Sequence, residues 1–186
     1  MTRQRFAKSD WLDHGLKQLG GYGPEALKLD AICASAGRTK GSFYHHFRDH
    51  SVFLTSLVVR WIELHTDAVI QALPEDATAL EKGSALTEIA IGLDYHLELG
   101  IRELSRRNAD LSNLVSQADE RRMAFLSELY EKSYGIGAKD ARFAAQVEYA
   151  AYVGTIMTRP DIRKAEQRGL SERFQSVMAS YFASCG

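Results

Sequence analysis

Apolar side chains recur at spacings of three and four residues along almost the whole chain of 186 residues. This period places them on one face of an α-helix, whereas a half-buried strand would alternate apolar and polar residues, and no segment does so. The three prolines, Pro24, Pro74 and Pro160, fall between the periodic segments, where a residue without an N–H group interrupts no helix. The sequence therefore predicts an all-α fold.

Capping residues, glycines and the ends of the apolar stripes predict nine helices. Ser9 is the expected N-cap of the first and Thr39 that of the third, while Gly37 supplies a sharp turn between the second and the third. Three short helices with a glycine turn between the last two fit a helix-turn-helix. The nine helices are expected at about residues 9–19, 29–35, 40–47, 51–73, 78–93, 95–106, 110–134, 139–158 and 171–183.

Charge is unevenly divided along the chain. Residues 1–50 hold eight Lys or Arg and five Asp or Glu, a net charge of +3, while the remainder holds 15 and 19, a net charge of −4. Four of the six histidines also fall within the first 50 residues. A basic end attached to an acidic body suggests that this end binds a polyanion.

No segment predicts a membrane span or a secretion signal. The longest uncharged apolar run, Ser51–Val59, is far shorter than the roughly 20 residues that cross a bilayer, and no apolar core follows the first basic residues. Cys33 and Cys185 have neither the spacing of a zinc site nor that of a disulfide framework. We expect a cytoplasmic protein with reduced thiols, no metal and no cofactor.

The segment Leu29–Asp49 carries the most specific signal. Phe43 and Phe47 lie one turn apart on its second helix and are expected to pack inward. A helix with the opposite face polar can enter the major groove of DNA. The residues on that outer face are Lys40, Ser42, Tyr44, His45 and Arg48.

The start of the same helix adds groups that suit a phosphate backbone. Arg38, Thr39 and the free N–H groups of the first turn can meet phosphates, and Gly41 lets the backbone come close to DNA. On a lone helix, Tyr44, His45 and His46 could equally well cap a small helical core. The whole pattern favours DNA binding.

This segment resembles the DNA-binding end of the TetR family of transcriptional regulators. The shared pattern is Ala-Gly at the turn, then Thr/Ser-x-Gly-Thr/Ser-hydrophobic-Tyr-x-His-Phe and a charged loop, and it runs almost unbroken from Leu29 to Phe47. The resemblance implies three helices for DNA, a fourth that connects, and five for a body that binds ligand and dimerises. It also implies a non-enzymatic repressor that binds a palindromic operator in double-stranded DNA as a homodimer and leaves it on binding a small-molecule effector.

Three residues depart from the family pattern. Lys28 stands where a capping Thr is usual, so the second helix loses an N-cap worth about 1 kcal/mol and gains a candidate phosphate contact. Arg38 replaces a usual Val in the turn, and His50 replaces a usual Lys at the start of the fourth helix. We expect residues 1–50 to form the DNA-binding domain and residues 51–186 the ligand-binding and dimerisation domain. The predicted DNA-binding residues are Lys28, Arg38, Thr39, Lys40, Gly41, Ser42, Tyr44, His45, Arg48 and His50.

In the body, Arg122 interrupts an otherwise apolar helical stripe. A charge on a buried face needs a partner, and two interpretations remain open. One is a structural pair with Asp119, Glu98 or Asp94, and the other is an anchor for an anionic ligand. Aromatic residues of neighbouring helices could line a pocket, although such stripes are more often plain core. The predicted ligand-binding residues are Trp61, His65, Tyr95, His96, Arg122 and Tyr149.

The last two predicted helices suit dimerisation. Small residues on 139–158 permit close helix contact, and 171–183 carries an apolar stripe. In the TetR family the final two helices of each subunit pair as a four-helix interface, which both stripes fit. The predicted interface residues are Val147, Ala151, Gly154, Phe174, Met178 and Tyr181.

Two other classes of function fit the sequence less well. A metal enzyme would have to use His45, His46 and His50, but adjacent histidines point about 100° apart on a helix and no acidic ligand accompanies them at a fixed spacing. The other class is an RNA-binding or purely structural helical protein. Readers of single-stranded RNA use exposed aromatic stacking surfaces, and the sequence shows none.

Overall fold

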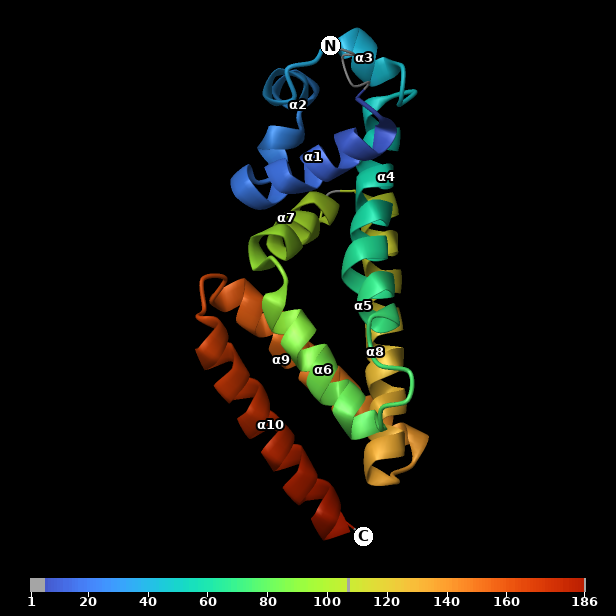
Figure 1. Ribbon diagram of the computed structural model, residues 1–186, viewed down its shortest axis with the longest axis vertical. Helices are drawn as coiled ribbons and strands as arrows, with labels where there is room; N and C mark the ends of the chain where they lie inside the picture. Colours follow the sequence, from blue (N-terminus) through green and yellow to red (C-terminus); the bar gives the residue numbers. More distant parts are fainter. Residues whose placement is uncertain (1–5, 107, 186) are drawn as a thin grey trace. The chain divides into compact units, whose positions relative to one another are not determined.

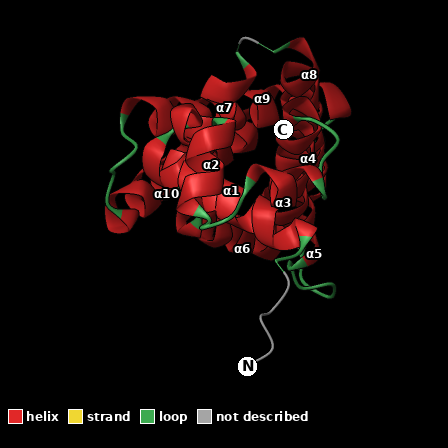
Figure 2. Cartoon of the chain, turned by 90° about the horizontal axis from the view of Figure 1, so that it is seen from above, coloured by secondary structure: helices red, strands yellow, loops and turns green. Residues whose placement is uncertain are grey.

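The computed structural model describes residues 6–106 and 108–185, the last two of these by their backbone alone. Every regular element in these ranges is a helix (Figure 1), which confirms the predicted all-α class. Only loops and turns connect the helices (Figure 2). In chain order the elements are α1 (Lys8–Tyr22), η1 (Pro24–Leu27), α2 (Leu29–Ser35), α3 (Lys40–Tyr44), α4 (His50–Ile62), η2 (Glu63–Asp67), α5 (Ala68–Gln71), α6 (Ala79–Gly92), α7 (Tyr95–Ser105), α8 (Ala109–Tyr134), α9 (Ala138–Thr158) and α10 (Lys164–Cys185).

Helical structure continues from α4 through a π-helical segment, η2, into α5, where the sequence predicts one helix over residues 51–73. With these three segments counted as one helix and the short 3-10 helix η1 set apart, the described part of the chain forms the nine predicted helices. Pro24 begins η1, because its fixed φ suits the first position of a helical turn. Four residues are too few to show an apolar stripe, so the periodicity does not reveal η1.

The start of α1 differs from the prediction. The N-cap is Ala7 and not Ser9, which lies inside the helix. The carboxylate of Asp10, at the third position of the helix, accepts a hydrogen bond of 2.7 Å from the N–H of Ala7, and this bond places the N-cap at Ala7 although Ala7 has no capping side chain. The prediction of Ser9 as a cap was therefore wrong.

The start of α10 also differs, since the helix begins at Lys164 and not at Ser171. A glycine inside a helix costs about 1 kcal/mol relative to Ala, so Gly169 disfavours a helix that runs through it. Tertiary bonds hold the first two turns nonetheless. Both nitrogens on one edge of the Arg168 guanidinium donate to the carboxylate of Glu88 on α6, at 2.6 and 2.5 Å.

The chain divides into two compact units. The first comprises Met1–Leu64 and Asp94–Ser116, and the second comprises His65–Leu93 and Gln117–Gly186. The first unit thus holds α1 to α4 and α7, and the second holds α5, α6, α9 and α10. The division of function expected after residue 50 remains a prediction.

Four aromatic side chains from α1, α3, α4 and the turn after α3 form the core at the N-terminal end of the first unit. Trp11, Phe43, Phe47 and Phe53 are at most 1% exposed. The ring centroid of Phe43 lies 5.3 Å from that of Trp11, 5.1 Å from that of Phe47 and 5.2 Å from that of Phe53. Aromatic pairs at these separations contribute about 0.5–1.5 kcal/mol beyond their buried area. The inward packing predicted for Phe43 and Phe47 is confirmed, and it fixes the orientation of α3.

Helix α7 packs against α1 within the same unit. The contact is close because Gly100 has no side chain: a Cβ there would lie 2.8 Å from Cγ of Leu19. Asp94 begins α7 by accepting hydrogen bonds from the N–H groups of His96 and Leu97, at 3.0 and 3.2 Å. Helix α7 follows α6 and precedes α8 in the chain, and it belongs to the same compact unit as α3.

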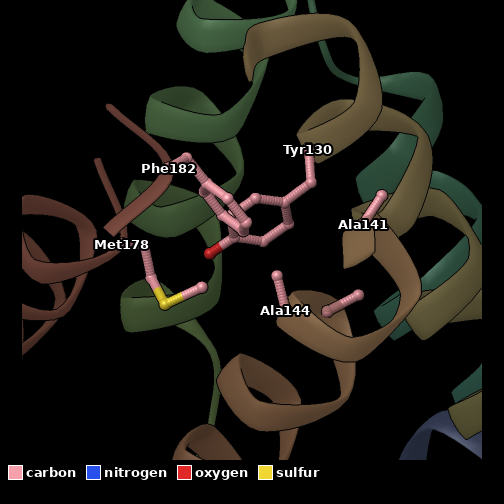
Figure 3. Packing of buried hydrophobic residues seen from close by; sticks show 6 residues of the cluster. Tyr130, Ala141, Ala144, Met178 and Phe182 are labelled. Atoms are coloured by element: carbon pink, nitrogen blue, oxygen red, sulfur yellow. The ribbon is translucent and has the colours of Figure 1, made fainter. Parts of the chain in front are cut away.

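The core of the second unit lies among α8, α9 and α10. Figure 3 shows the rings of Tyr130 and Phe182 lying against each other, with Met178 beside them. Small alanines on α9 leave room for these larger groups. The buried members of this core are Tyr130, Ala141, Ala144, Ala145, Met178 and Phe182.

Across the residues that the structure describes, no helix is both long enough and apolar enough to cross a membrane. The same residues contain no group of three or more His, Cys, Asp or Glu side chains placed to hold a metal ion. Cys33 is a buried free thiol.

Candidate functional site

The turn between α2 and α3 has the geometry that the sequence predicts. Gly37 adopts a φ of 61°, a conformation that glycine takes without a steric penalty. The N–H of Arg38 then donates to the carbonyl of Cys33 at 2.9 Å, which closes the end of α2. Thr39 caps α3, because its hydroxyl oxygen accepts the N–H of Ser42 at 3.2 Å. The side chain of Lys28 makes no capping bond to α2, as predicted.

Helix α3 ends at Tyr44 and not at Phe47, since the chain turns there toward the next cap. That cap is Asp49, whose carboxylate accepts the N–H of Val52 at 2.9 Å and starts α4. This backbone hydrogen bond, with that from Arg48, lowers the pKa of the Asp49 carboxyl. The turn keeps Phe47 in the core although it lies beyond the helix.

The outer face of α3 is exposed. The Tyr44 side chain is 49% exposed, and its ring meets that of the buried Phe43 edge-to-face at 5.6 Å. Ser42 is half-buried. The other predicted DNA contacts at this surface are all exposed: Lys28, Thr39, Lys40, Gly41, His45 and Arg48.

Three of the basic residues at this surface pair with carboxylates. Nζ of Lys40 lies 2.5 Å from Oδ1 of Asp30 on α2, and this hydrogen bond raises the pKa of Lys40. Lys28 pairs with Glu25, one turn before it. Arg48 donates from Nε to Asp49 at 2.9 Å. Each of these three cations therefore already has an acidic partner.

Two predicted DNA contacts have structural roles that the sequence does not reveal. The guanidinium of Arg38 lies over the ring of Phe6, 4.8 Å from its centroid, and the residue is half-buried. Nε2 of His50 lies 2.7 Å from the carbonyl oxygen of Leu27. A carbonyl only accepts, so this nitrogen is the donor, and His50 ties the start of α4 to the end of η1.

The second unit contains a cavity of about 200 Å³, lined mostly by apolar side chains. Three predicted ligand-binding residues line it: His65, Arg122 and Tyr149. The other three are not among its lining residues and belong to the first unit. Trp61 is fully buried, Tyr95 is buried and His96 is exposed.

Arg122 is held by hydrogen bonds on every side of its guanidinium. Its Nε donates to the hydroxyl of Thr66 at 2.9 Å, one terminal nitrogen to the Tyr149 hydroxyl at 3.1 Å, and the other to the carbonyl of His65 at 3.2 Å. The Tyr149 hydroxyl in turn donates to Asp119 at 2.6 Å. Asp119 is one of the three predicted partners of Arg122 and connects to it through this hydroxyl.

The other two predicted partners of Arg122 have different roles. Glu98 is buried and lies 2.8 Å from a terminal nitrogen of Arg102, one turn along α7. Asp94 caps the start of α7. Both acids belong to the first unit and stabilise α7 itself.

Sequence reasoning missed several polar residues that line the cavity, among them Glu148 on α9 and Gln167 on α10. The carboxylate of Glu148 accepts a hydrogen bond of 2.8 Å from the hydroxyl of Tyr130. Burial raises the pKa of Glu148, and burial together with the nearby carboxylate raises that of Tyr130. The sequence signal that could have revealed Glu148 is an acidic residue among the small residues that recur at helical spacing on α9.

The predicted dimerisation residues differ in exposure. Val147 and Tyr181 are 38% and 55% exposed, and Ala151 is also exposed. Gly154 and Phe174 are half-buried, while Met178 lies in the core of the unit. Further large apolar side chains of α9 and α10 are exposed near them in sequence: Phe143, Met157, Leu170 and Val177.

Comparison with known proteins identifies the N-terminal helices. Residues 12–53, which span most of α1, all of α2 and α3 and the start of α4, match the family described as bacterial regulatory proteins of the tetR family. The chain thus carries the DNA-binding helices of the tetR family at its N-terminal end. This match supports the predicted DNA-binding class of function.

Solved structures resemble the fold of this chain over nearly its whole length. The reduced form of NemR from E. coli is 20% identical, with a TM-score of 0.75 over 91% of this chain and 95% of that one. A regulatory protein TetR from Rhodobacter sphaeroides is 19% identical, with a TM-score of 0.76 over 91% and 97%. A transcriptional regulator from Rhodococcus sp. Rha1 is 14% identical, with a TM-score of 0.77 over 93% and 96%. These likenesses concern the fold. No curated protein matches the sequence.

Proposed function

We propose that this protein is a TetR-family transcriptional regulator, a ligand-released repressor that binds a palindromic operator as a homodimer in the cytoplasm, where chromosomal DNA is read. The observation that carries the proposal is the exposed polar face of α3, fixed in orientation by the buried Phe43. Thr39 and Lys40 begin this helix, and Tyr44 ends it. In the proposed complex α3 enters the major groove, with Lys40 and the helix start toward the phosphates.

The short length of α3 supports a dimer. Its five residues can contact only a few base pairs, and two-fold symmetry doubles the recognised sequence. The exposed apolar side chains of α9 and α10 supply the proposed contact surface. Phe143, Val147, Gly154 and Met157 recur at helical spacing along α9, and a Cβ placed on Gly154 would meet nothing within 4 Å. A second copy of the chain can therefore approach this face closely.

The cavity of the second unit supports a ligand response. His65 and Thr66, which line the cavity, belong to η2, and helical structure runs from η2 into α4 without a break. A ligand that prefers a changed η2 thus has a continuous helical route toward the unit that carries α3. A differential affinity of roughly 1–3 kcal/mol between the two states would change operator affinity about 5- to 150-fold.

Selection of DNA sequences by the purified full-length chain, combined with sedimentation of the free protein and its complex, tests the proposal. We expect a preferred site with a dyad, half-sites about one helical turn or more apart, and a dimer in solution. A preferred site without a dyad would contradict the palindromic operator. A free protein that stays monomeric at micromolar concentration would contradict the homodimer.

A further inference from the structure

The cavity contains an acid without a basic partner. Glu148 lines it from α9, and the hydroxyl of Tyr130 is the group that hydrogen-bonds its carboxylate. Within the described residues, no Lys, Arg or His side chain forms an ion pair with Glu148 or lowers its pKa. Glu148 is half-buried, and a carboxylate withdrawn from water is costly unless a cation or several donors compensate it, so this side chain favours a cationic neighbour.

The guanidinium that lines the same cavity is engaged elsewhere. Arg122 donates to Thr66, Tyr149 and the carbonyl of His65, and Tyr149 links it to Asp119. An anionic ligand would have to replace these hydrogen bonds. The geometry therefore favours a structural role for Arg122 over the role of an anion anchor.

A second acceptor in the cavity is unsatisfied. Gln167 on α10 is only 5% exposed and lines the cavity, and its Oε1 is buried without a hydrogen-bond donor within the described ranges. A buried amide oxygen that lacks a donor costs about 1–3 kcal/mol. This oxygen on α10 and the Glu148 carboxylate on α9 can both accept hydrogen bonds from an occupant of the cavity.

The remaining lining sets the size and apolar character of the occupant. The volume of about 200 Å³ is below the roughly 300–1,000 Å³ of pockets for drug-sized ligands, so a small molecule fits. The rings of Phe125, Tyr134, Tyr152 and Phe174 line the cavity. Aromatic faces attract cations and also cover apolar groups.

We propose that this cavity binds a small organic cation, an ammonium or amidinium group on an apolar body, whose N–H groups donate to Glu148 with Gln167 as a second acceptor. The inference rests on the proposed function, because it names the chemical class of the effector for that site. It assigns the charged anchor to Glu148 and leaves Arg122 in the framework of the cavity.

Calorimetric titration of the full-length protein with three probes of one size tests the charge preference. The probes are 2-phenylethylammonium, neutral 2-phenylethanol and anionic phenylacetate. We expect the ammonium to bind at least about tenfold more tightly than either of the other two, as a charge-assisted hydrogen bond to a half-buried carboxylate requires. Equal binding, tighter binding of phenylacetate, or no binding of the ammonium at roughly 10 mM would overturn the proposal.

Matched variants locate the effect. Glu148→Gln keeps an oxygen that can accept from Tyr130 and removes the charge, so the ammonium should lose at least about tenfold in affinity while 2-phenylethanol changes little. Glu131→Gln makes the same change at an exposed site on α8 and should alter neither. Gln167→Leu should weaken the ammonium and spare benzyltrimethylammonium, which has no N–H group. An ammonium affinity that is unchanged in both Glu148→Gln and Gln167→Leu would overturn the assignment.

Release of DNA is measured separately, by fluorescence anisotropy of the selected operator with and without saturating 2-phenylethylammonium. If the ammonium binds through Glu148 and the operator complex persists, the inference about the cavity stands and ligand release fails. If the operator complex dissociates while the three probes bind equally, ligand release stands and the inference about charge fails.

Discussion

Nζ of Lys40 at the start of α3 lies 2.5 Å from Oδ1 of Asp30 on α2, and both side chains are largely exposed. The pair joins the two helices of the helix-turn-helix across their outer surface. A phosphate placed at the start of α3 would compete with Asp30 for the same ammonium group. Asp30 therefore holds Lys40 at the proposed DNA surface and also opposes its contact with DNA.

Lys40→Ala should weaken operator binding and reduce the slope of log affinity against log salt by about one, because one phosphate contact is lost. Asp30→Asn is the opposing variant: it removes both the competing charge and its repulsion of phosphate, and should strengthen binding. Both variants should melt at the temperature of the unaltered protein, since exposed ion pairs contribute little to stability. Equal affinities and salt slopes for all three proteins would place another element at the DNA.

Tyr44 and Phe43 are neighbours on α3 with opposite expected effects. Tyr44→Phe removes only an exposed hydroxyl and should lower operator affinity while leaving the free energy of unfolding unchanged. Phe43→Ala empties a fully buried site among three other rings and should cost about 3–5 kcal/mol of stability. Chemical denaturation and operator titration of both variants separate the two effects. A Tyr44→Phe variant with full affinity for the operator would remove this hydroxyl from the proposed interface.

The sequence predicted the helices well because the period of the apolar residues directly reports burial on one face. It also located the turn at Gly37 and the cap at Thr39, where local backbone chemistry decides the structure. The ends of α1 and α10 were wrong where contacts outweighed local propensity. The carboxylate of Asp10 binds the N–H of Ala7 and places the N-cap there, and Glu88 on another helix holds the first turns of α10.

The body was harder to predict, because helical spacing shows which residues share a face and not what that face meets. Trp61 and His65 are one turn apart in the chain, yet they belong to different compact units and only His65 lines the cavity. Glu148 depends on a hydroxyl 18 residues away on another helix, and His50 on a carbonyl 23 residues away. No local pattern carries such pairings.

Gly154→Glu tests the proposed contact between two copies of the chain. A side chain at this position meets nothing within 4 Å in one protomer, so the fold should tolerate it. In a dimer it would place a charge in an apolar contact, and we expect a shift toward monomer with lower operator affinity. Gln117→Glu adds the same charge at an exposed site on α8 and should leave the dimer intact. Sedimentation of both variants decides, and a Gly154→Glu dimer would move the interface elsewhere.

The free protein should lose stability through Glu148 as the pH rises. Burial raises the pKa of Glu148 in the folded chain above its unfolded value, so the folded state holds this proton more strongly. Its contribution is fully present below the unfolded pKa and is lost as the pH rises through the folded pKa. Glu148→Gln cannot ionise, so its melting temperature relative to that of the unaltered protein should increase as the pH rises above the ordinary carboxyl range.

The difference between the two proteins is the quantity to measure, because His65, Arg122 and Tyr134 line the same cavity and are present in both. Their own titrations cancel in that comparison to the extent that they do not depend on Glu148. A saturating organic cation should abolish the difference or reverse it, since it compensates the carboxylate in the unaltered protein alone. A melting difference that is independent of pH in the free protein would show that Glu148 titrates alike in the folded and unfolded chain. The carboxylate would then be hydrated, and the demand for a cation in the cavity would disappear.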